Sequence, residues 1–509
     1  MITYITRLYN QIHQLYTIKT YIDTIYKSFD QEELLLESFE SLKQLIFTSG
    51  SLYIKFFQWY ISKLKSQIIS NDIPESQHIE FQYKQQHNKN ILKFITYFED
   101  IFEQCPYHSL KHTKRIFKES MNGMAIDDYI DIATLRRIAS GSIGQVYYGK
   151  RKEDGIEVAI KVKHPNIERD LENQYELIKL LKFIQSFNYL RIKYNLFFNI
   201  DDFLEDINLQ CDFNNEANNT NTFIENFKDS SNFIIFPEPL YQSKDLLISR
   251  YIDGKDVNSL TDMQKYQTSL NFICFFKQML FVDNFIHGDL HCKNWKIRTN
   301  ETTKKTQIIV YDCGICFKNI NTDLTQEFWF ALVHYDIEKL IIILKDFIKE
   351  NNDINIDYFN HKLFDNDIHN LFKHIIEESL GTSLIMNILL NLFKINNLVV
   401  HKFMLNFTIL ICVIEEYMRN NNLINKHINK NISLFHIINN NQLDIITFCD
   451  VKKCYPKVKN MIELNMKDNY KKYKKNSCKN NIESIDNSDD GKQLFTRISL
   501  SGLTFKSPE

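Results

Sequence analysis

The sequence predicts an α+β fold in which a β-rich unit is followed by a larger helical unit and preceded by a helical extension. Three observations predict this fold. Residues 1–115 carry apolar side chains at three- and four-residue spacing, which is typical of amphipathic helices. From about residue 132, short β-rich runs joined by turns replace that pattern. After Gly254 most of the chain is again helical in pattern.

These observations divide the chain into four predicted parts. The last part is rich in Lys, Asn and Ser and poor in large apolar residues, a composition that predicts disorder. The parts are a helical extension at 1–115, a β-rich lobe with inserted helices at 116–257, a helical lobe at 258–463 and a disordered tail at 464–509.

The composition favours a globular protein without a strong overall field. The chain has 509 residues, of which 44% are hydrophobic and 24% charged, and its net charge is −2. Such a charge does not attract nucleic acid, and the basic run at 467–479 is typical of a solvated tail, so no nucleic-acid partner is expected. The most apolar region, 383–414, is interrupted by Lys, Asn and His. Its apolar runs are shorter than the ~20 residues of a spanning helix, so we predict buried helices there.

The cysteines indicate a reducing compartment. The ten cysteines are scattered and no secretory signal peptide precedes them, so we predict reduced thiols in an intracellular, cytoplasmic protein. Cys313 and Cys316 form a C-x-x-C with His287 and His291 nearby, which is one possible zinc site. No second ligand pair stands at a standard spacing, so the zinc interpretation is not favoured.

The β-rich lobe begins with two runs that carry candidate phosphate contacts. The runs at 134–151 and 156–165 are joined by KEDG, a hairpin signal. Lys161 lies among apolar neighbours in the second run, where a lysine is costly to bury unless it meets an anion. Small residues in the middle of the first run separate two β-like stretches there. They would let backbone N–H groups approach phosphates: Ala139, Ser140, Gly141, Ser142 and Gly144.

Helical segments at 166–186 and 200–228 must supply an acidic partner for Lys161. The candidates are Glu172, Glu176, Asp212 and Glu216. Asp212 and Glu216 stand four apart, so a helix would place both on one face. Two like charges there call for a cation, either Lys161, another lysine or a metal. The alternative is a solvated acidic face.

Two fragments in the helical lobe complete the pattern: HGDLHCKNW at 287–295 and IVYDCGIC at 309–316. Asp289 and Asn294 have the spacing of the base and the metal ligand in protein kinases, and Asp312 follows a β-like run in the place of D-F-G. The order of small-residue loop, strand lysine, helix acid, D-x-x-x-x-N and D-x-G predicts phosphoryl transfer or ATP hydrolysis with ATP and Mg²⁺.

The chain resembles the UbiB family of atypical kinases, the aarF-domain-containing kinases. The family's loop A-A-A-S-I-G-Q-V is ASGSIGQV here, and V-A-[IV]-K-V-x-H-P is VAIKVKHP. Its E-x-D helix motif with a following E-A pair is QCDFNNEA, and H-A-D-x-H-P-G-N is HGDLHCKN. Its upstream K-x-G-Q is KFFQ at 55–58. The likeness covers about 40–420.

The resemblance implies a protein-kinase-like bilobal fold whose helical extension lies over the site of a protein substrate. It implies ATP binding and ATPase activity more strongly than protein phosphorylation. Lys161 would hold phosphates with Glu216 as its ion-pair partner, and Asp289 would be the catalytic acid/base position. Asn294 and Asp312 would hold Mg²⁺.

The resemblance also implies a latch and a class of substrate. Lys55 and Gln58 would form the latch, with Asp212 as the remaining acid that Lys55 could pair with. Small-molecule or lipid substrates, a link to lipid or quinone metabolism, contact with a membrane surface and a mitochondrial location follow from the family alone. The rival interpretation is a nucleotide-binding pseudokinase that acts as a switch or scaffold.

Several positions depart from the family pattern: Phe57 for the latch Gly, Gln210 for the first Glu of E-x-D, Cys313 for the D-F-G Phe, Cys292 and Lys293 for Pro-Gly, and Arg250 for a hinge acid. None removes a phosphate or metal ligand. Phe57 needs space that Gly leaves empty, and Gln210 removes a carboxylate. We therefore expect a weaker latch and a site that opens more readily.

Overall fold

The computed structural model describes residues 2–28, 31–69, 89–187, 199–256, 259–291, 293–303, 305–318, 327–328, 331–332, 336–351, 360–378, 382–396 and 398–420. The predicted tail at 464–509 and the basic run at 467–479 lie outside the described residues. No described helix is both long enough and apolar enough to cross a membrane.

The N-terminal extension is helical and has a core of its own. Its elements are α1 (Ile2–Lys27), α2 (Glu32–Ser49), α3 (Ser51–Ile69), helical residues 89–98 and the 3₁₀ turn η1 (Glu99–Phe102). Gly50, at φ +102°, separates α2 from α3, and Gly tolerates this left-handed region better than other residues. Buried side chains such as Phe39, Ile46 and Phe98 pack together between these helices. The predicted helical extension is confirmed over its described part.

The β-rich lobe is a five-stranded antiparallel sheet with the strand order β1-β2-β3-β6-β5. Its strands are β1 (Ile130–Ser140), β2 (Gly144–Arg151), β3 (Glu157–Lys163), β5 (Pro239–Gln242) and β6 (Leu246–Arg250). The predicted hairpin is present between β2 and β3, where Gly155 adopts φ +71°.

Two helices precede this sheet: α5 (Leu110–Ser120) and α6 (Ile126–Tyr129). Ile116 and Phe117 of α5 share an apolar cluster with Val158 and Ile248 of the sheet. The predicted boundary at residue 115 therefore falls inside a helix that belongs to the β-rich lobe. The change from the extension to this lobe comes before α5.

Three inserted helices follow β3: α7 (Ile167–Ser186), α9 (Ile200–Gln210) and α10 (Phe213–Asn226). Asn199 caps the N-terminus of α9 by accepting from the Asp201 N–H, and Asp212 caps α10 by accepting from the Asn214 N–H. The short turn between α9 and α10 redirects the chain, so that Glu216 in the first turn of α10 is buried.

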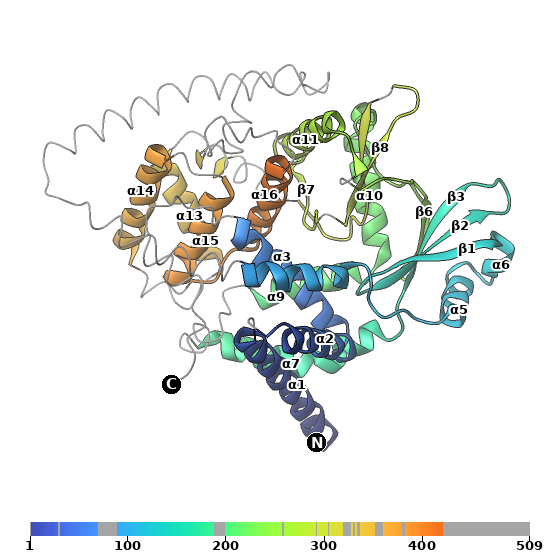
Figure 1. Ribbon diagram of the computed structural model, residues 1–509, viewed down its shortest axis with the longest axis horizontal. Coiled ribbons are helices and arrows are strands. Elements are labelled where there is room, and N and C mark those ends of the chain that lie inside the picture. Colours follow the sequence, from blue (N-terminus) through green and yellow to red (C-terminus); the bar gives the residue numbers. More distant parts are fainter. Residues whose placement is uncertain are drawn as a thin grey trace, which may run out of the picture.

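The helical lobe contains the largest apolar core. Its helices are α11 (Asp262–Lys277), the π-helical turn η4 (Gln278–Val282), α13 (Ile337–Asn351), α14 (His361–Glu378), α15 (Thr382–Ile395) and α16 (Lys402–Asn420). The apolar region at 383–414 forms much of α15 and α16, which pack against each other as predicted. In Figure 1 the helices α13, α14 and α15 lie at the opposite end from the large sheet, whereas α16, α3 and α9 lie nearer the middle.

Small strands at the junction of the lobes carry the loops of the site. The strands are β4 (Ile234–Ile235), β7 (Phe285–His287), β8 (Trp295–Thr299), β9 (Thr306–Val310) and β10 (Cys316–Lys318). The 3₁₀ turn η2 (Lys228–Ser230) precedes β4. β9 was predicted as a strand, but β7, β8 and β10 were not. Strands of three to five residues give too few alternating positions for a period to be recognised.

Candidate active site

A cavity of about 320 Å³ lies where the two lobes meet the extension. The loop between β1 and β2, the strand β3, the helix α10 and the loops after β7 and β9 all line it. The predicted site residues that it brings together are Lys55, Gln58, Ala139, Gly141, Ser142, Gly144, Lys161, Glu216, Asp289, Asn294 and Asp312. Ser140 and Asp212 are the two predicted site residues that do not line it.

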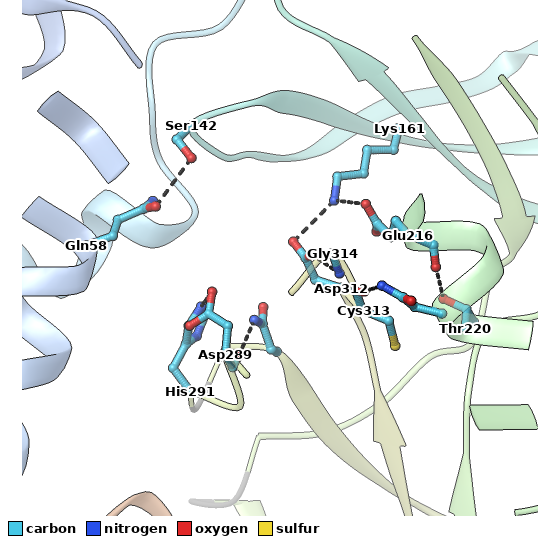
Figure 2. Close-up of polar contacts among 12 residues, drawn as sticks. Gln58, Ser142, Lys161, Glu216, Thr220, Asp289, His291, Asp312, Cys313 and Gly314 are labelled. Carbon is cyan, nitrogen blue, oxygen red and sulfur yellow. Dashed lines mark hydrogen bonds and ion pairs between the residues drawn. The ribbon is translucent and has the colours of Figure 1, made fainter. Parts of the chain in front are cut away.

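Lys161 on β3 lies between two carboxylates. Its Nζ is 2.7 Å from Glu216 Oε2 and 3.2 Å from Asp312 Oδ2 (Figure 2). The Glu216 side chain is 9% exposed and Asp312 is 45% exposed, so Glu216 is the interior partner and Asp312 faces the cavity. Of the four acids considered as partners of Lys161, Glu216 is the one that forms the ion pair. The alternative of a solvated acidic face is wrong for Glu216, because its side chain is buried.

Burial and mutual charge separate the behaviour of these three groups. Burial raises the pKa of Glu216 to about 7, although Lys161 opposes that shift. Burial also acts against the ionised form of Asp312, but Lys161 and then Lys55 hold the pKa of that carboxyl well below its usual range. Burial lowers the pKa of Lys161, but Asp312 and Glu216 outweigh it and raise that pKa above its usual value. A charged lysine therefore faces an ionised Asp312 at neutral pH.

The loop after β7 presents Asp289 to the same cavity. Asn294 Nδ2 donates to the Asp289 carbonyl at 2.7 Å, which closes the loop, and both residues line the cavity. His287 Nδ1 accepts from the Asp289 N–H at 3.2 Å. The Asp289 carboxylate itself is 28% exposed toward the cavity. This is the placement that the D-x-x-x-x-N spacing predicts.

His291 was not identified from the sequence as a site residue, yet it lies beside Asp289. Its Nδ1 accepts from the Lys293 N–H at 3.2 Å, so its Nε2 carries the proton in the neutral ring. That Nε2 is 3.8 Å from Asp289 Oδ2. Burial lowers the pKa of His291, which favours the neutral ring as a hydrogen-bond donor next to the carboxylate. The signal for it was its position two residues after Asp289 in a loop already assigned to chemistry.

Asp312 stands at the end of β9 in a strained backbone conformation. Its φ is +49°, a region that non-glycine residues rarely adopt outside functional sites. Its Oδ1 accepts from the Gly314 N–H at 3.2 Å, which leaves Oδ2 toward Lys161. Among the described residues no three His, Cys, Asp or Glu side chains are arranged to hold a metal ion together, so the zinc interpretation gains no support.

The loop between β1 and β2 needs its second glycine. A Cβ at Gly144 would lie 2.9 Å from the Phe213 ring and 3.0 Å from the Val162 carbonyl oxygen, which is too close for any other residue. The Gly141 N–H donates to the Gly144 carbonyl at 2.9 Å and shapes the turn. The small residues here therefore serve close packing as well as access for a ligand.

Ser140 binds the extension instead of the cavity. Its N–H donates to the Glu103 carbonyl at 2.9 Å, and its carbonyl accepts from the Cys105 N–H at 2.8 Å. The assignment of Ser140 to the phosphate-binding loop is therefore corrected: it fixes that loop to the end of the extension.

A chain of buried hydrogen bonds holds the loop from behind. The Gly141 carbonyl can only accept, so His164 Nε2 donates to it, at 3.0 Å. His164 Nδ1 must then accept from His108 Nδ1, at 2.8 Å. His108 Nε2 in turn accepts from the Thr113 hydroxyl at 2.9 Å, and Thr113 is 3.0 Å from the Tyr147 hydroxyl. Every proton in this chain is directed toward the loop, and both imidazoles are neutral.

Acid should therefore destabilise the fold through His164, whose burial lowers its pKa to about 4. The unfolded chain binds this proton near pH 6.5, so stability is complete above that pH and is lost as the pH falls toward 4. By pH 5 the loss from His164 is about 2 kcal/mol. Melting temperatures at pH 7.5 and pH 5 should show a smaller drop in His164→Asn than in the parent. Exposed His13→Asn is the matched control, and an equal drop in all three proteins would contradict this role of His164.

Gln58 on α3 connects the extension to the loop. Its Nε2 donates to the Ile101 carbonyl at 2.9 Å, and its Oε1 accepts from the Ser142 hydroxyl at 3.3 Å (Figure 2). Lys55 lines the cavity one turn earlier. The predicted pairing of Lys55 with Asp212 is not met: within the described structure these two residues form no ion pair, and Asp212 Oδ1 caps α10.

Phe57 points into the extension and away from the cavity. It is 3% exposed and packs against Phe98 and Tyr60, with ring centroids 6.0 Å and 6.1 Å apart. Gln210 does line the cavity, and its Nε2 donates to the Asp206 carbonyl at 3.0 Å. The steric argument for a latch weakened by Phe57 is therefore wrong, because the ring never enters the cleft.

The end of the extension also contacts the loop after β7, which was not predicted. Glu103 Oε2 lies 3.3 Å from Lys293 Nζ, and the Phe102 ring lies 4.5 Å from the His291 ring, centroid to centroid. Lys293 occupies the position of the family's Gly, so this ion pair depends on one of the departures from the pattern. Residues 99–105 carry no motif, and no signal in the sequence could have identified them.

Comparisons with known proteins agree with this geometry. A family model described as the ABC1 atypical kinase-like domain matches residues 100–344. A probable serine/threonine-protein kinase, abkC of Dictyostelium discoideum, is 31% identical over 216 residues, which are 41% of this chain and 30% of that protein. The probable protein kinase UbiB of Klebsiella pneumoniae is 26% identical over 299 residues, which are 56% of this chain and 53% of that protein.

The chain spans about a third to a half of the length of the curated relatives it matches. Among solved structures, the Mycobacterium tuberculosis protein Rv3197 in complex with erythromycin aligns with 55% of this chain and 67% of its own, at 17% identity and a TM-score of 0.36. The residues that the family model matches run from the small-residue loop to beyond the D-x-G turn. The chain therefore carries an ABC1 atypical kinase-like domain over residues 100–344 and is similar to the UbiB kinases.

Proposed function

We propose that this chain binds ATP with Mg²⁺ and transfers the γ-phosphoryl group to a small acceptor or to water. The observation that supports it most is Lys161 held by Glu216 on the wall of a 320 Å³ cavity that Asp289 and Asn294 also line. Phosphoryl transfer needs little covalent chemistry from the protein, so positioning and charge provide most of the catalysis.

Each side chain has a role in this proposal. Lys161 neutralises phosphate oxygens, and Glu216 keeps its ammonium group at the cavity wall. Asp289 accepts the proton of the attacking hydroxyl, or orients a water molecule, and the neutral His291 ring lies beside that carboxylate, 3.8 Å from Oδ2. Lys55 also lines the cavity, so Lys161 is not the only cation available to a polyphosphate.

The residues present fit a magnesium ion. Asp312 offers a carboxylate oxygen to the cavity, and Asn294 offers an amide oxygen, the hard ligands that Mg²⁺ prefers together with phosphate oxygens. When bound, Mg²⁺ would neutralise charge on the phosphates.

A second cavity supports a small acceptor. It has a volume of about 80 Å³, shares Lys55, Gln58, Gln210 and Asp289 with the first cavity, and lies between α3, α9 and α16. Such a volume holds about five water molecules, which suits a small acceptor group. A small molecule, or the head of a lipid or quinone precursor, is the acceptor class we propose. ADP formation with a phenol, a phospholipid or a peptide added in turn would compare these classes.

Lys161→Ala should weaken Mg·ATP binding about 10- to 100-fold, because a charge-assisted hydrogen bond contributes about 1.5–3 kcal/mol. Calorimetric titration with a non-hydrolysable ATP analogue measures this affinity. Lys150→Ala is the matched control, since Lys150 is a half-exposed lysine on the neighbouring strand and does not line the cavity. An unchanged dissociation constant in Lys161→Ala would remove the basis for the proposed function.

The alternative is a nucleotide-binding pseudokinase that acts as a switch or scaffold. The ion pair between Lys161 and Asp312 favours the pseudokinase, because the lysine contacts the carboxylate that is proposed to bind Mg²⁺. Both proposals predict the same loss of binding in Lys161→Ala. They differ in turnover, because the pseudokinase forms no ADP above the background of the Asp289→Asn variant.

A further inference from the structure

Two thiols lie in the turn that follows Asp312. Cys313 and Cys316 stand three apart, and Cys316 Sγ is 3.3 Å from the Cys313 carbonyl oxygen. Turns of this length bring their first and fourth Cα atoms within about 7 Å, close to the range that a disulfide spans. Both cysteines are free in the structure.

The two thiols differ in exposure. Cys313 stands in the turn at the wall of the nucleotide cavity, but it is 1% exposed. Figure 2 shows its side chain pointing away from Lys161, below Asp312. Cys316 is only partly buried, so a small oxidant meets Cys316 first.

The same turn positions the proposed metal ligand. Asp312 precedes Cys313 and accepts from the Gly314 N–H within the turn. The Cys313 carbonyl accepts from Asn219 Nδ2 at 2.9 Å, which anchors the turn to α10, the helix that carries Glu216. A disulfide between residues 313 and 316 would change the conformation of the turn that positions Asp312.

We infer that Cys313 and Cys316 form a redox-modifiable dithiol, whose oxidation to a disulfide by a peroxide weakens Mg·ATP binding at the neighbouring carboxylate. The family's aromatic residue at position 313 could not react in this way, so the property belongs to this chain. The effect on nucleotide rests on the proposed function, whereas the formation of the disulfide does not.

The chemistry balances with hydrogen peroxide as the oxidant. The Cys316 sulfur attacks one peroxide oxygen, the O–O bond breaks, and water leaves as Cys316 becomes a sulfenic acid. The Cys313 sulfur then attacks the Cys316 sulfur, the S–O bond breaks, and the hydroxyl leaves as a second water with the Cys313 proton. Two thiols lose two electrons and two protons in total, and one peroxide is reduced to two waters.

The new bond changes the geometry next to Asp312. A disulfide requires the two sulfur atoms to be about 2.0 Å apart, which is much shorter than a hydrogen bond between thiols. The turn must tighten, and Cys316 Sγ must leave the Cys313 carbonyl. Asp312 directly precedes the turn, has a positive φ and accepts from the Gly314 N–H within it. A shift of the turn therefore also moves the Asp312 carboxylate.

The test uses the full-length chain, reduced and then treated with a small excess of hydrogen peroxide. After free thiols are alkylated, peptide mass spectrometry should find residues 313 and 316 linked in the parent and not in Cys316→Ser. Calorimetry with Mg²⁺ and a non-hydrolysable ATP analogue should show an affinity about 10-fold or more lower after oxidation, restored by dithiothreitol. Cys274→Ser, which removes a cysteine outside the turn, should behave like the parent.

Absence of the linked peptide overturns the dithiol, and a linked peptide with unchanged affinity overturns its effect on the site. If the reduced chain binds no nucleotide at all, the proposed function fails, while the linked peptide still decides whether the dithiol exists.

Discussion

Asp289→Asn is expected to slow ATP turnover about 10²- to 10⁴-fold, the usual contribution of a positioned general base. The amide has the size of the carboxylate but cannot accept a proton. Mg·ATP affinity should stay within a few-fold of the parent, because Asp289 is not placed against Lys161 or Glu216. Single-turnover measurements of ADP formation at saturating Mg·ATP separate the chemical step from binding.

The control for this variant is Asp229→Asn, which makes the same change at an exposed position in η2. Its rate should equal that of the parent. A rate for Asp289→Asn within threefold of the parent would remove Asp289 from the chemistry and leave the pseudokinase as the better account.

Phe57→Gly is expected to unfold the extension instead of restoring a tighter latch. Burial makes Phe57 part of the apolar core between α3 and residues 89–98, and loss of a buried phenylalanine costs about 3–5 kcal/mol. Glycine inside a helix adds about 1 kcal/mol relative to alanine. Residues 1–115 should become sensitive to limited proteolysis, and the Gln58 contact with Ser142 should be lost with them.

Two companion variants sharpen this test. Phe57→Leu keeps most of the apolar volume and should cost less than Phe57→Gly. Gln210→Glu changes a cavity residue without touching that core, so it should leave proteolysis of the extension unchanged. If Phe57→Gly is as resistant to protease as the parent, its ring does not hold the extension together.

The side of α3 that Phe57 occupies could have been predicted from the sequence. Ile54, Phe57 and Ile61 recur at three- and four-residue spacing and are all buried in the extension core. Lys55 and Gln58 recur with the same spacing on the face toward the cavities. The expectation of a weaker latch followed from comparison with the family's Gly, and it neglected the helical period of this chain.

The ion pair of Lys161 with Glu216 was predictable because the local sequence determines where each of the two side chains points. An alternating strand places Lys161 toward the interior, and a capped helix places Glu216 in its first turn. The contacts of Phe102 and Glu103 with the loop after β7 could not be predicted. They join segments almost 190 residues apart, and no periodicity within either segment specifies the other.

Ser140 illustrates the same limit within a recognised motif. The loop was identified by its small residues, but the use of each backbone group depends on which segment lies above it. The chain at Glu103 and Cys105 bonds to the backbone N–H and carbonyl of Ser140, and this follows only from the packing of the extension on the sheet.

The most direct test of the central claim is ADP formation from Mg·ATP by the purified chain, with Asp289→Asn and Lys161→Ala measured beside it. The account predicts Mg²⁺-dependent ADP formation by the parent, binding without turnover in Asp289→Asn, and weak binding in Lys161→Ala. A parent protein that binds no Mg·ATP, or turnover equal in all three proteins, would contradict it.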